Sequence, residues 1–152
     1  MDSDRIDNRI ELPYPVSRVW RALTHSTEFG AWFGVRFDSP FQAGHESTGE
    51  IVTPGLEHLT WRAVIQDIEP EQYFAYTWHP YSIDPSHDYS EEVPTLVEFR
   101  LAPTGSDGTL LTLTESGFQD LPDARRAEAW SMHEQGWSQQ MKNIRDYLDR
   151  HA

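Results

Sequence analysis

The sequence predicts an α+β domain in which an antiparallel sheet packs against one long C-terminal helix. Between residues 46 and 115, apolar and polar side chains alternate in short segments, which is typical of half-buried strands. Residues 130–148 instead place large apolar side chains at the spacing of one helix face. The helical segments and the strands occupy separate parts of the chain, so the pattern favours α+β over a doubly wound parallel sheet.

The length and the charge narrow the classes of function. The 152 residues fit a single domain, 1–152, long enough to bury about two-thirds of its unfolded surface. Twenty-five acidic and twelve basic residues give a net charge of −13, which repels phosphate backbones and anionic lipid head groups. We therefore expect neither nucleic acid nor a membrane as a partner.

The composition also indicates the cellular compartment of the protein. The chain has no cysteine, which excludes disulfides, thiol catalysis and Cys-ligated metals. It has no apolar run near the length that crosses a bilayer, and residues 1–4 are acidic where a signal peptide is basic. These features predict a soluble, cytoplasmic protein.

The N-terminal part is predicted to form one strand and two short helices. Residues 5–12 alternate apolar with polar or charged side chains, and Pro13 ends this strand. A first helix follows Pro15, whose ring suits the start of a helix, and carries one apolar face. A second helix is expected from Ser26 as its N-cap to Gly34 as its left-handed terminator.

Five further strands are predicted from alternation. They cover residues 46–53, 59–65, 72–78, 95–101 and 109–115. Turns are expected at residues 67–71, which include a proline, and at residues 104–108, which are rich in Gly, Ser and Asp. Residues 79–94 contain three prolines and no period, so they are predicted to be a long loop, and such loops are often functional.

Candidate metal ligands gather in that loop. They are His79, Asp84, His87 and Asp88, with His58 elsewhere in the chain. Their spacing fits no known ligand motif, so no metal site is expected. No nucleophile elbow, phosphate-binding glycine loop or Ser/His/Asp order is present either, so the sequence predicts no catalytic residue and no cofactor.

His133 is a polar residue on the apolar face of the last helix. It lies three residues after Trp130 and four before Trp137, so helical geometry places it between two indoles. One interpretation is a core histidine satisfied by a single hydrogen bond, and the other is a polar group that faces an internal ligand cavity. The pair His133-Glu134 begins like a zinc-binding helix motif, but Trp137 stands where the second histidine is needed, so that motif is absent.

Glu115 is the second polar candidate. It continues the inward face of Leu111 and Leu113 at the end of its strand. We expect its carboxylate to reach solvent as the strand leaves the sheet, with a position at a cavity mouth as the alternative. If Glu115 lay beside His133, the two would form an acid/base pair of the kind that a cyclase or hydrolase uses.

Several short segments occur in an order that is found in one known family. They are residues 19–24, Trp32-Phe33, residues 67–70 with Thr77-Trp78, residues 109–118 and Gly136-Trp137. Together they resemble the family named after the C-terminal domain of the activator of Hsp90 ATPase, which belongs to the START-like, helix-grip superfamily. The resemblance implies a curved antiparallel sheet around the C-terminal helix. It also implies an elongated cavity, which in many relatives holds a lipid, a polyketide or another aromatic molecule.

The expected binding residues come from the inward faces of the second helix, the strands and the last helix. They are Trp32, Phe33, Trp61, Trp78, Phe99, Glu115, Trp130, His133, Trp137 and Met141. The alternative is that these rings simply pack together as a core. A small domain rarely needs so many indoles for that purpose, and rings beside a gap bind flat ligands by stacking.

The resemblance does not settle the activity, because the superfamily includes ligand carriers, cyclases, self-sacrificing resistance proteins and the chaperone-binding domain itself. We expect the chain to bind a hydrophobic or aromatic small molecule without catalysing a reaction. An enzyme acting on a polyketide-like substrate and a chaperone-binding module are the alternatives, and a homodimer stays open. Burial of about 250 Å² of apolar ligand surface yields about 6 kcal/mol before association costs, which predicts micromolar binding.

Overall fold

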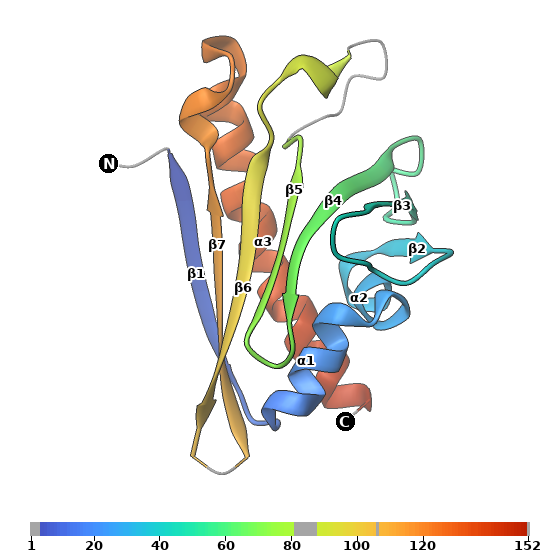
Figure 1. Cartoon of the computed structure of the whole chain (residues 1–152), viewed down its shortest axis with the longest axis vertical. Helices are drawn as coiled ribbons and strands as arrows, with labels where there is room; N and C mark the ends of the chain where they lie inside the picture. Colours follow the sequence, from blue (N-terminus) through green and yellow to red (C-terminus); the bar gives the residue numbers. More distant parts are fainter. Residues whose placement is uncertain (1–3, 81–87, 106, 152) are drawn as a thin grey trace.

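The computed structural model describes residues 4–80, 88–105 and 107–151. Figure 1 shows a twisted sheet with a long helix, α3, along one face, and two short helices, α1 and α2, beside the lower half of α3. The strands are β1 (Arg5–Leu12), β2 (Val35–Phe37), β3 (Glu46–Ile51), β4 (Thr60–Glu69), β5 (Tyr73–Trp78), β6 (Thr95–Thr104) and β7 (Gly108–Ser116). The helices are α1 (Val16–Thr24), α2 (Ser26–Phe33) and α3 (Asp123–His151), with short 3₁₀ turns at η1 (Tyr89–Glu91) and η2 (Phe118–Asp120).

The strands form one sheet in the order β1-β7-β6-β5-β4-β3-β2, and every described pair of neighbours is antiparallel. β1 and β2 are its two edges. The hydrophobic core lies between the inner face of the sheet, on which α3 packs, and the three helices. The predicted α+β class is therefore confirmed, with two short helices after the first strand and a long C-terminal helix packed on the sheet.

The long helix begins well before its apolar stripe. α3 starts at Asp123, and its buried face from Trp137 to Leu148 is the one that the spacing predicts. Trp130, expected at the start of the stripe, is only half-buried. The extra turns at the N-terminal end carry mostly Ala, Arg and Glu, which favour a helix by their own propensity without forming an apolar stripe.

The second short helix ends as predicted, at Gly34, whose φ of 94° is the left-handed conformation that glycine adopts freely. Its start differs slightly, because α2 begins at Ser26 and His25 occupies the capping position. Trp32 is buried, and its Nε1 donates a hydrogen bond to the Ala22 carbonyl oxygen of α1 at 2.9 Å. This bond ties α2 to α1.

The predicted turn at residues 67–71 is wrong in its first half. β4 continues to Glu69, because Asp67 pairs with Ala75 of β5 after a register shift. The chain turns at Glu71, whose φ of 63° lies in the left-handed region. Pairing with β5 outweighs the local turn signal of the proline.

The other predicted strands are confirmed with small changes of length, whereas the short edge strand β2 was not predicted. β6 and β7 form the predicted hairpin and extend beyond their predicted ends, whereas β3 stops at Ile51. Of the long loop at residues 79–94, the stretch 81–87, with Asp84 and His87, lies outside the described residues. Within the described ranges, no three His, Cys, Asp or Glu side chains are grouped to hold a metal ion. No helix in the part of the chain that the structure describes has the length and apolar character needed to cross a membrane.

Candidate functional site

A buried carboxylate lies at the centre of the space between α3 and the sheet. Glu115 is at the end of β7, on the face that α3 covers, and its side chain has no exposed surface. The expectation that it reaches solvent is therefore wrong. The end of the strand is enclosed because Trp78, Thr95 and the side chains of α3 surround it.

Four side-chain donors bind this carboxylate. Oε1 accepts hydrogen bonds from Trp137 Nε1 and His133 Nδ1, each at 2.8 Å. Oε2 accepts from Trp78 Nε1 at 2.8 Å and from Thr95 Oγ1 at 2.6 Å. We call these five residues the Glu115 cluster. A carboxylate offers about four acceptor positions, so the hydrogen-bonding capacity of Glu115 is filled.

The cluster stabilises the ionised form of Glu115. Burial would raise the pKa of this carboxyl, but the charge of His133 and the hydrogen bonds from His133, Thr95 and Trp137 outweigh burial. The pKa of Glu115 therefore lies below its ordinary value. The His133 side chain is 17% exposed, so this member of the cluster is accessible from solvent. An ionised carboxylate that orients an imidazole is an arrangement used in general acid/base catalysis.

The members reach the cluster from three strands and one helix. His133 and Trp137 are one turn apart on α3, which is why their spacing already placed them together. Trp78 at the end of β5 pairs with Thr95 at the start of β6, and this register brings both beside the end of β7. Thr95 was missed by the sequence reasoning, because no pattern along the chain marks which strand ends meet.

Six rings pack around the Glu115 cluster, and two of them, Trp78 and Trp137, also belong to it. The six rings are Phe33, Trp61, Tyr76, Trp78, Phe99 and Trp137, and we call them the aromatic cluster. Neighbouring ring centroids lie 5.3 to 6.4 Å apart, mostly edge to face, which is the usual range for ring contacts. These rings therefore contact one another, as the core-packing alternative expects.

Three buried polar atoms near these rings have no hydrogen-bond partner among the described residues. They are Ser47 Oγ, Trp61 Nε1 and the Tyr76 hydroxyl oxygen, and we call them the unpaired atoms. The three side chains come from neighbouring strands, β3, β4 and β5, and each is buried. Burial, together with the charge of Glu115, raises the pKa of Tyr76 well above its ordinary value, so its phenol is neutral and is able to donate. The sequence could not predict that these atoms lack partners, because alternation along a strand shows which face of the sheet a side chain is on and not which groups it contacts.

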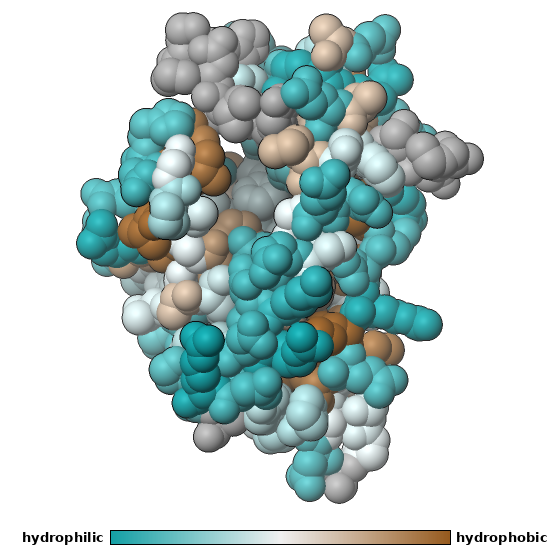
Figure 2. Space-filling model, turned by 180° about the vertical axis from the view of Figure 1, so that it is seen from behind, coloured by the Kyte–Doolittle hydropathy of each residue, from teal (hydrophilic) through white to brown (hydrophobic). Residues whose placement is uncertain are grey.

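Both clusters approach the surface at one place. Phe33, Trp78 and His133 are half-buried, with ring centroids 6.1 Å apart between Phe33 and Trp78 and 5.3 Å apart between Trp78 and His133. Gly136 lies one turn after His133 on α3, and a Cβ at this position would meet open space. Figure 2, which views the molecule from behind, shows the surface hollowed in its upper half beside α3. We call the surface formed by these four residues the recess.

Three of the predicted residues lie away from the recess. Trp130 sits at the edge of the sheet, where its Nε1 donates to the Arg5 carbonyl oxygen at 2.9 Å. Met141 is buried further along α3, in the core. Trp32 lines a separate concavity of about 280 Å³ between α2 and the last turns of α3. Helical spacing placed these residues on the right elements but could not tell which part of the molecule covers each of them.

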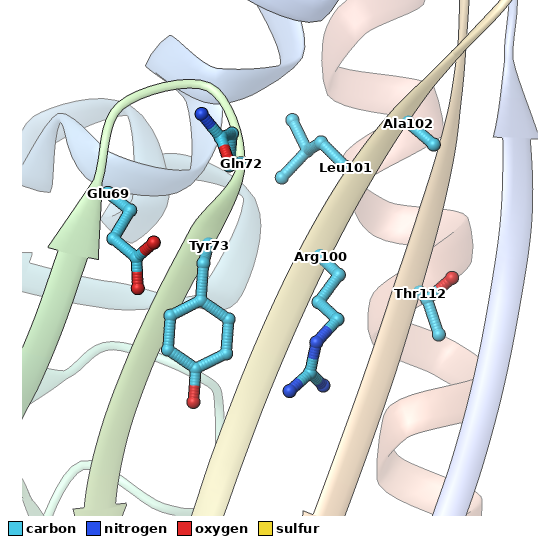
Figure 3. A pocket seen from close by; sticks show the side chains of 7 residues that line it. All are labelled: Glu69, Gln72, Tyr73, Arg100, Leu101, Ala102 and Thr112. Carbon is cyan, nitrogen blue, oxygen red and sulfur yellow. The ribbon is translucent and has the colours of Figure 1, made fainter.

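A larger concavity, of about 540 Å³, lies on the face of the sheet opposite α3 (Figure 3). The Tyr73 and Arg100 side chains lie side by side there, with the guanidinium carbon 4.9 Å from the ring centre, and both bond to Glu98. Burial and then Glu98 raise the pKa of Tyr73 to about 12. None of the predicted ligand-binding residues lines this concavity, and the Tyr73 and Arg100 side chains that line it both pair with Glu98.

The fold and the enclosed rings define the class of protein. A curved antiparallel sheet that holds a long C-terminal helix over a buried aromatic cluster is a helix-grip domain of the SRPBCC type. The family model described as Activator of Hsp90 ATPase homolog 1-like protein matches residues 13–149. The chain belongs to this family, which confirms the resemblance found in the sequence.

Solved structures share the fold. Protein MLL2253 from Mesorhizobium loti is 26% identical over 97% of this chain and 98% of its own, with a TM-score of 0.74. The Aha1 dimer from Colwellia psychrerythraea, known from a solution structure, is 16% identical over 95% of both chains, with a TM-score of 0.68. DynU16, from the dynemicin biosynthetic locus, is 20% identical over 96% of this chain and 47% of its own, with a TM-score of 0.71. The comparison with curated proteins gave no match.

Proposed function

We propose that the chain binds a hydrophobic or aromatic small molecule at the recess, in contact with the aromatic cluster and the unpaired atoms. The observation that carries the proposal is the position of the unpaired atoms beside the packed rings. A core that served stability alone would favour apolar side chains there, because each buried polar group without a partner costs about 1–3 kcal/mol. A ligand with a carbonyl oxygen would accept hydrogen bonds from Trp61 and Tyr76 and remove part of this cost.

Ligand entry requires at least one ring to move, because the rings contact one another in this structure. Trp78 is held by its hydrogen bond to Glu115, whereas Phe33 is half-buried and has no polar anchor. We therefore expect Phe33 to change rotamer and a flat ligand to take its place between Trp61 and Trp78. The ring contacts that Phe33 loses are worth about 0.5–1.5 kcal/mol each, and the rings of the ligand would form similar contacts in their place. Displacement of Phe33 therefore costs little free energy.

A fluorescence titration tests this proposal, because Trp61, Trp78 and Trp137 all belong to the aromatic cluster. The probes are flavone and anthraquinone, which are flat and carry a ring ketone, and palmitic acid, which is neither flat nor aromatic. We expect the two flat probes to change the tryptophan emission with micromolar affinity and palmitic acid to bind more weakly. No response to any of the three would contradict the proposal.

A matched pair of substitutions locates the binding site. Gly136→Leu extends a side chain into the recess without meeting another atom of the free protein at its Cβ, and Lys142→Leu adds the same side chain on the exposed side of α3. We expect Gly136→Leu to weaken binding of the flat probes at least tenfold and Lys142→Leu to leave it unchanged. Equal affinity of both variants would place the ligand elsewhere.

An acid/base reaction is the second candidate, because Glu115 lies 2.8 Å from His133 and is ionised. Here Glu115 would orient the imidazole, and His133 in its neutral form would take a proton from water or substrate at the recess. Hydrolysis of p-nitrophenyl acetate by the wild type, His133→Gln and Glu115→Gln tests this. Loss of turnover in both variants supports catalysis, and wild-type turnover no faster than buffer removes the candidate. A chaperone partner and a cytoplasmic location stay predictions from the sequence.

A further inference from the structure

From Asp7 to Glu11, the outer side of edge strand β1 presents backbone groups that have no partner among the described residues, whereas the outward carbonyl oxygen of Arg5 accepts a hydrogen bond from Trp130 Nε1 at 2.9 Å. Its neighbour β7 lies on one side only, and Figure 1 shows no other strand or helix beyond β1 on the other side. The Asp4 carbonyl oxygen accepts a hydrogen bond from Phe118 N at 3.2 Å, on the side of β7. Backbone groups alternate in direction along a strand, so even-numbered residues face β7 and odd-numbered residues face the free edge.

The odd-numbered side chains of β1 carry alternating charges. They are Arg5, Asp7, Arg9 and Glu11, and all four are exposed. Two copies of β1 paired antiparallel about Asn8 would place Asp7 opposite Arg9 and Arg5 opposite Glu11 in both halves of the pair. Every odd-numbered pair would then join opposite charges, which stabilises cross-strand pairing.

Neighbouring registers are disfavoured by the same charges. A shift by two residues in one direction places Arg5 opposite Arg9 and Asp7 opposite itself, and a shift in the other direction places Asp7 opposite Glu11 and Arg9 opposite itself. Like charges directly opposite one another destabilise a pair of strands. A shift by one residue sets outward backbone groups against inward ones and loses the ladder of hydrogen bonds. The sequence of β1 therefore selects one two-fold register.

We propose that the chain forms a homodimer in which two β1 strands pair antiparallel about Asn8 and join the two sheets. Charged edge strands usually prevent such pairing by repulsion, but the charges of this strand attract a second copy. Among the described residues, Arg9 and Glu11 form no ion pair, so their charges are available to a partner. Asp7 is already oriented on the exposed face by Arg5 at 2.8 Å and by Thr114 at 3.0 Å.

Cross-linking through a single introduced thiol tests the register directly, because the chain has no cysteine. The Asn8 positions of two copies would form a non-hydrogen-bonded pair with Cα atoms about 4.5 Å apart, within the range of a disulfide. We expect Asn8→Cys to give a disulfide-linked dimer as the major species under mild oxidation. Arg9→Cys would face Asp7 instead of itself, and Lys142→Cys reports on random collision, so both should stay largely monomeric. Equal cross-linking of the three variants, or none at Asn8→Cys, overturns the proposal.

Charge reversal tests the same interface without a covalent bond. Arg9→Glu places two acids opposite each other, whereas Lys142→Glu makes the same change of net charge on the exposed side of α3. Sedimentation equilibrium at about 0.15 M salt, where charges more than about 8 Å apart are screened, should show dimers for the wild type and Lys142→Glu and monomers for Arg9→Glu. The double variant Asp7→Arg with Arg9→Asp restores opposite pairs and should dimerise again. A wild type that stays monomeric at all concentrations, or an Arg9→Glu variant that still dimerises, contradicts the proposal.

Discussion

Replacing Glu115 with alanine removes the acceptor that four donors share. Thr95 and Trp137 are buried, so their donors would not regain water, and each costs about 1–3 kcal/mol when left unpaired. Trp78 and His133 are half-buried and recover part of their hydrogen bonding from solvent. We therefore expect Glu115→Ala to lower the free energy of unfolding by about 3–5 kcal/mol, the range seen when one partner of a buried pair is removed.

Two further variants separate the charge from the shape. Glu115→Gln keeps the shape but turns an NH₂ group toward two of the donors, so its expected cost is about 2 kcal/mol. Glu50→Ala removes an exposed carboxylate that pairs with Arg36, and it should cost less than about 1 kcal/mol. Urea unfolding followed by circular dichroism measures all three. A Glu115→Ala variant as stable as Glu50→Ala would refute the expectation that the buried donors of the Glu115 cluster need this acceptor.

The pH dependence gives an independent check on the same residue. Because the pKa of Glu115 in the folded protein lies below its ordinary value of 4.5, its charge contributes stability above pH 4.5. That contribution is lost as the pH falls below 4.5 and through the folded-state pKa. The difference in stability between the wild type and Glu115→Gln should therefore shrink as the pH falls below 4.5. A difference that grows in acid would mean that Glu115 is protonated in the folded protein.

Three other substitutions have defined outcomes. Gly136→Ala should raise the free energy of unfolding by about 0.5–1 kcal/mol, because a glycine inside a helix is destabilising and the new methyl group meets no other atom. A lower Tm would show that other atoms pack against this position. Glu28→Gln should lower the free energy of unfolding in urea by about 1–3 kcal/mol, because the Arg18 side chain beside it is only 12% exposed and loses a charged acceptor. An unchanged free energy of unfolding would mean that solvent replaces this ion pair. Tyr73→Phe should remove a phenol that titrates at about 12 by ultraviolet absorbance, and loss of a phenol with the ordinary pKa of 10 would instead contradict the bond to Glu98.

Local spacing was enough to predict the elements that hold the site. The alternation that ends at Glu115 and the helical spacing of His133 and Trp137 each depend on neighbours in sequence, so they are visible in the chain itself. Alternation also gave the inward face of Phe99 in β6. These patterns fix which side chains face the core, and the structure confirms them.

The contacts within the site could not be predicted in the same way. Glu115 meets His133 only because the registers of β5, β6 and β7 enclose the end of the strand under α3, and register is a long-range property. Trp130 has the same helical spacing as Trp137, but its indole lies at the edge of the sheet and donates to the Arg5 carbonyl oxygen. Helical periodicity predicts the direction in which a side chain points from the helix axis. It does not predict which strand or helix lies in that direction.

Side-chain NMR of the six tryptophan indoles tests the binding proposal most directly. The indole N–H of Trp61 has no partner among the described residues, whereas those of Trp32 and Trp130 donate to backbone carbonyl oxygens far from the recess. On addition of flavone, we expect the Trp61 resonance to move downfield as it gains an acceptor, with the Trp78 resonance shifting beside it and those of Trp32 and Trp130 unchanged. A Trp61 resonance that stays in place while the probe is bound would contradict a ligand at the recess.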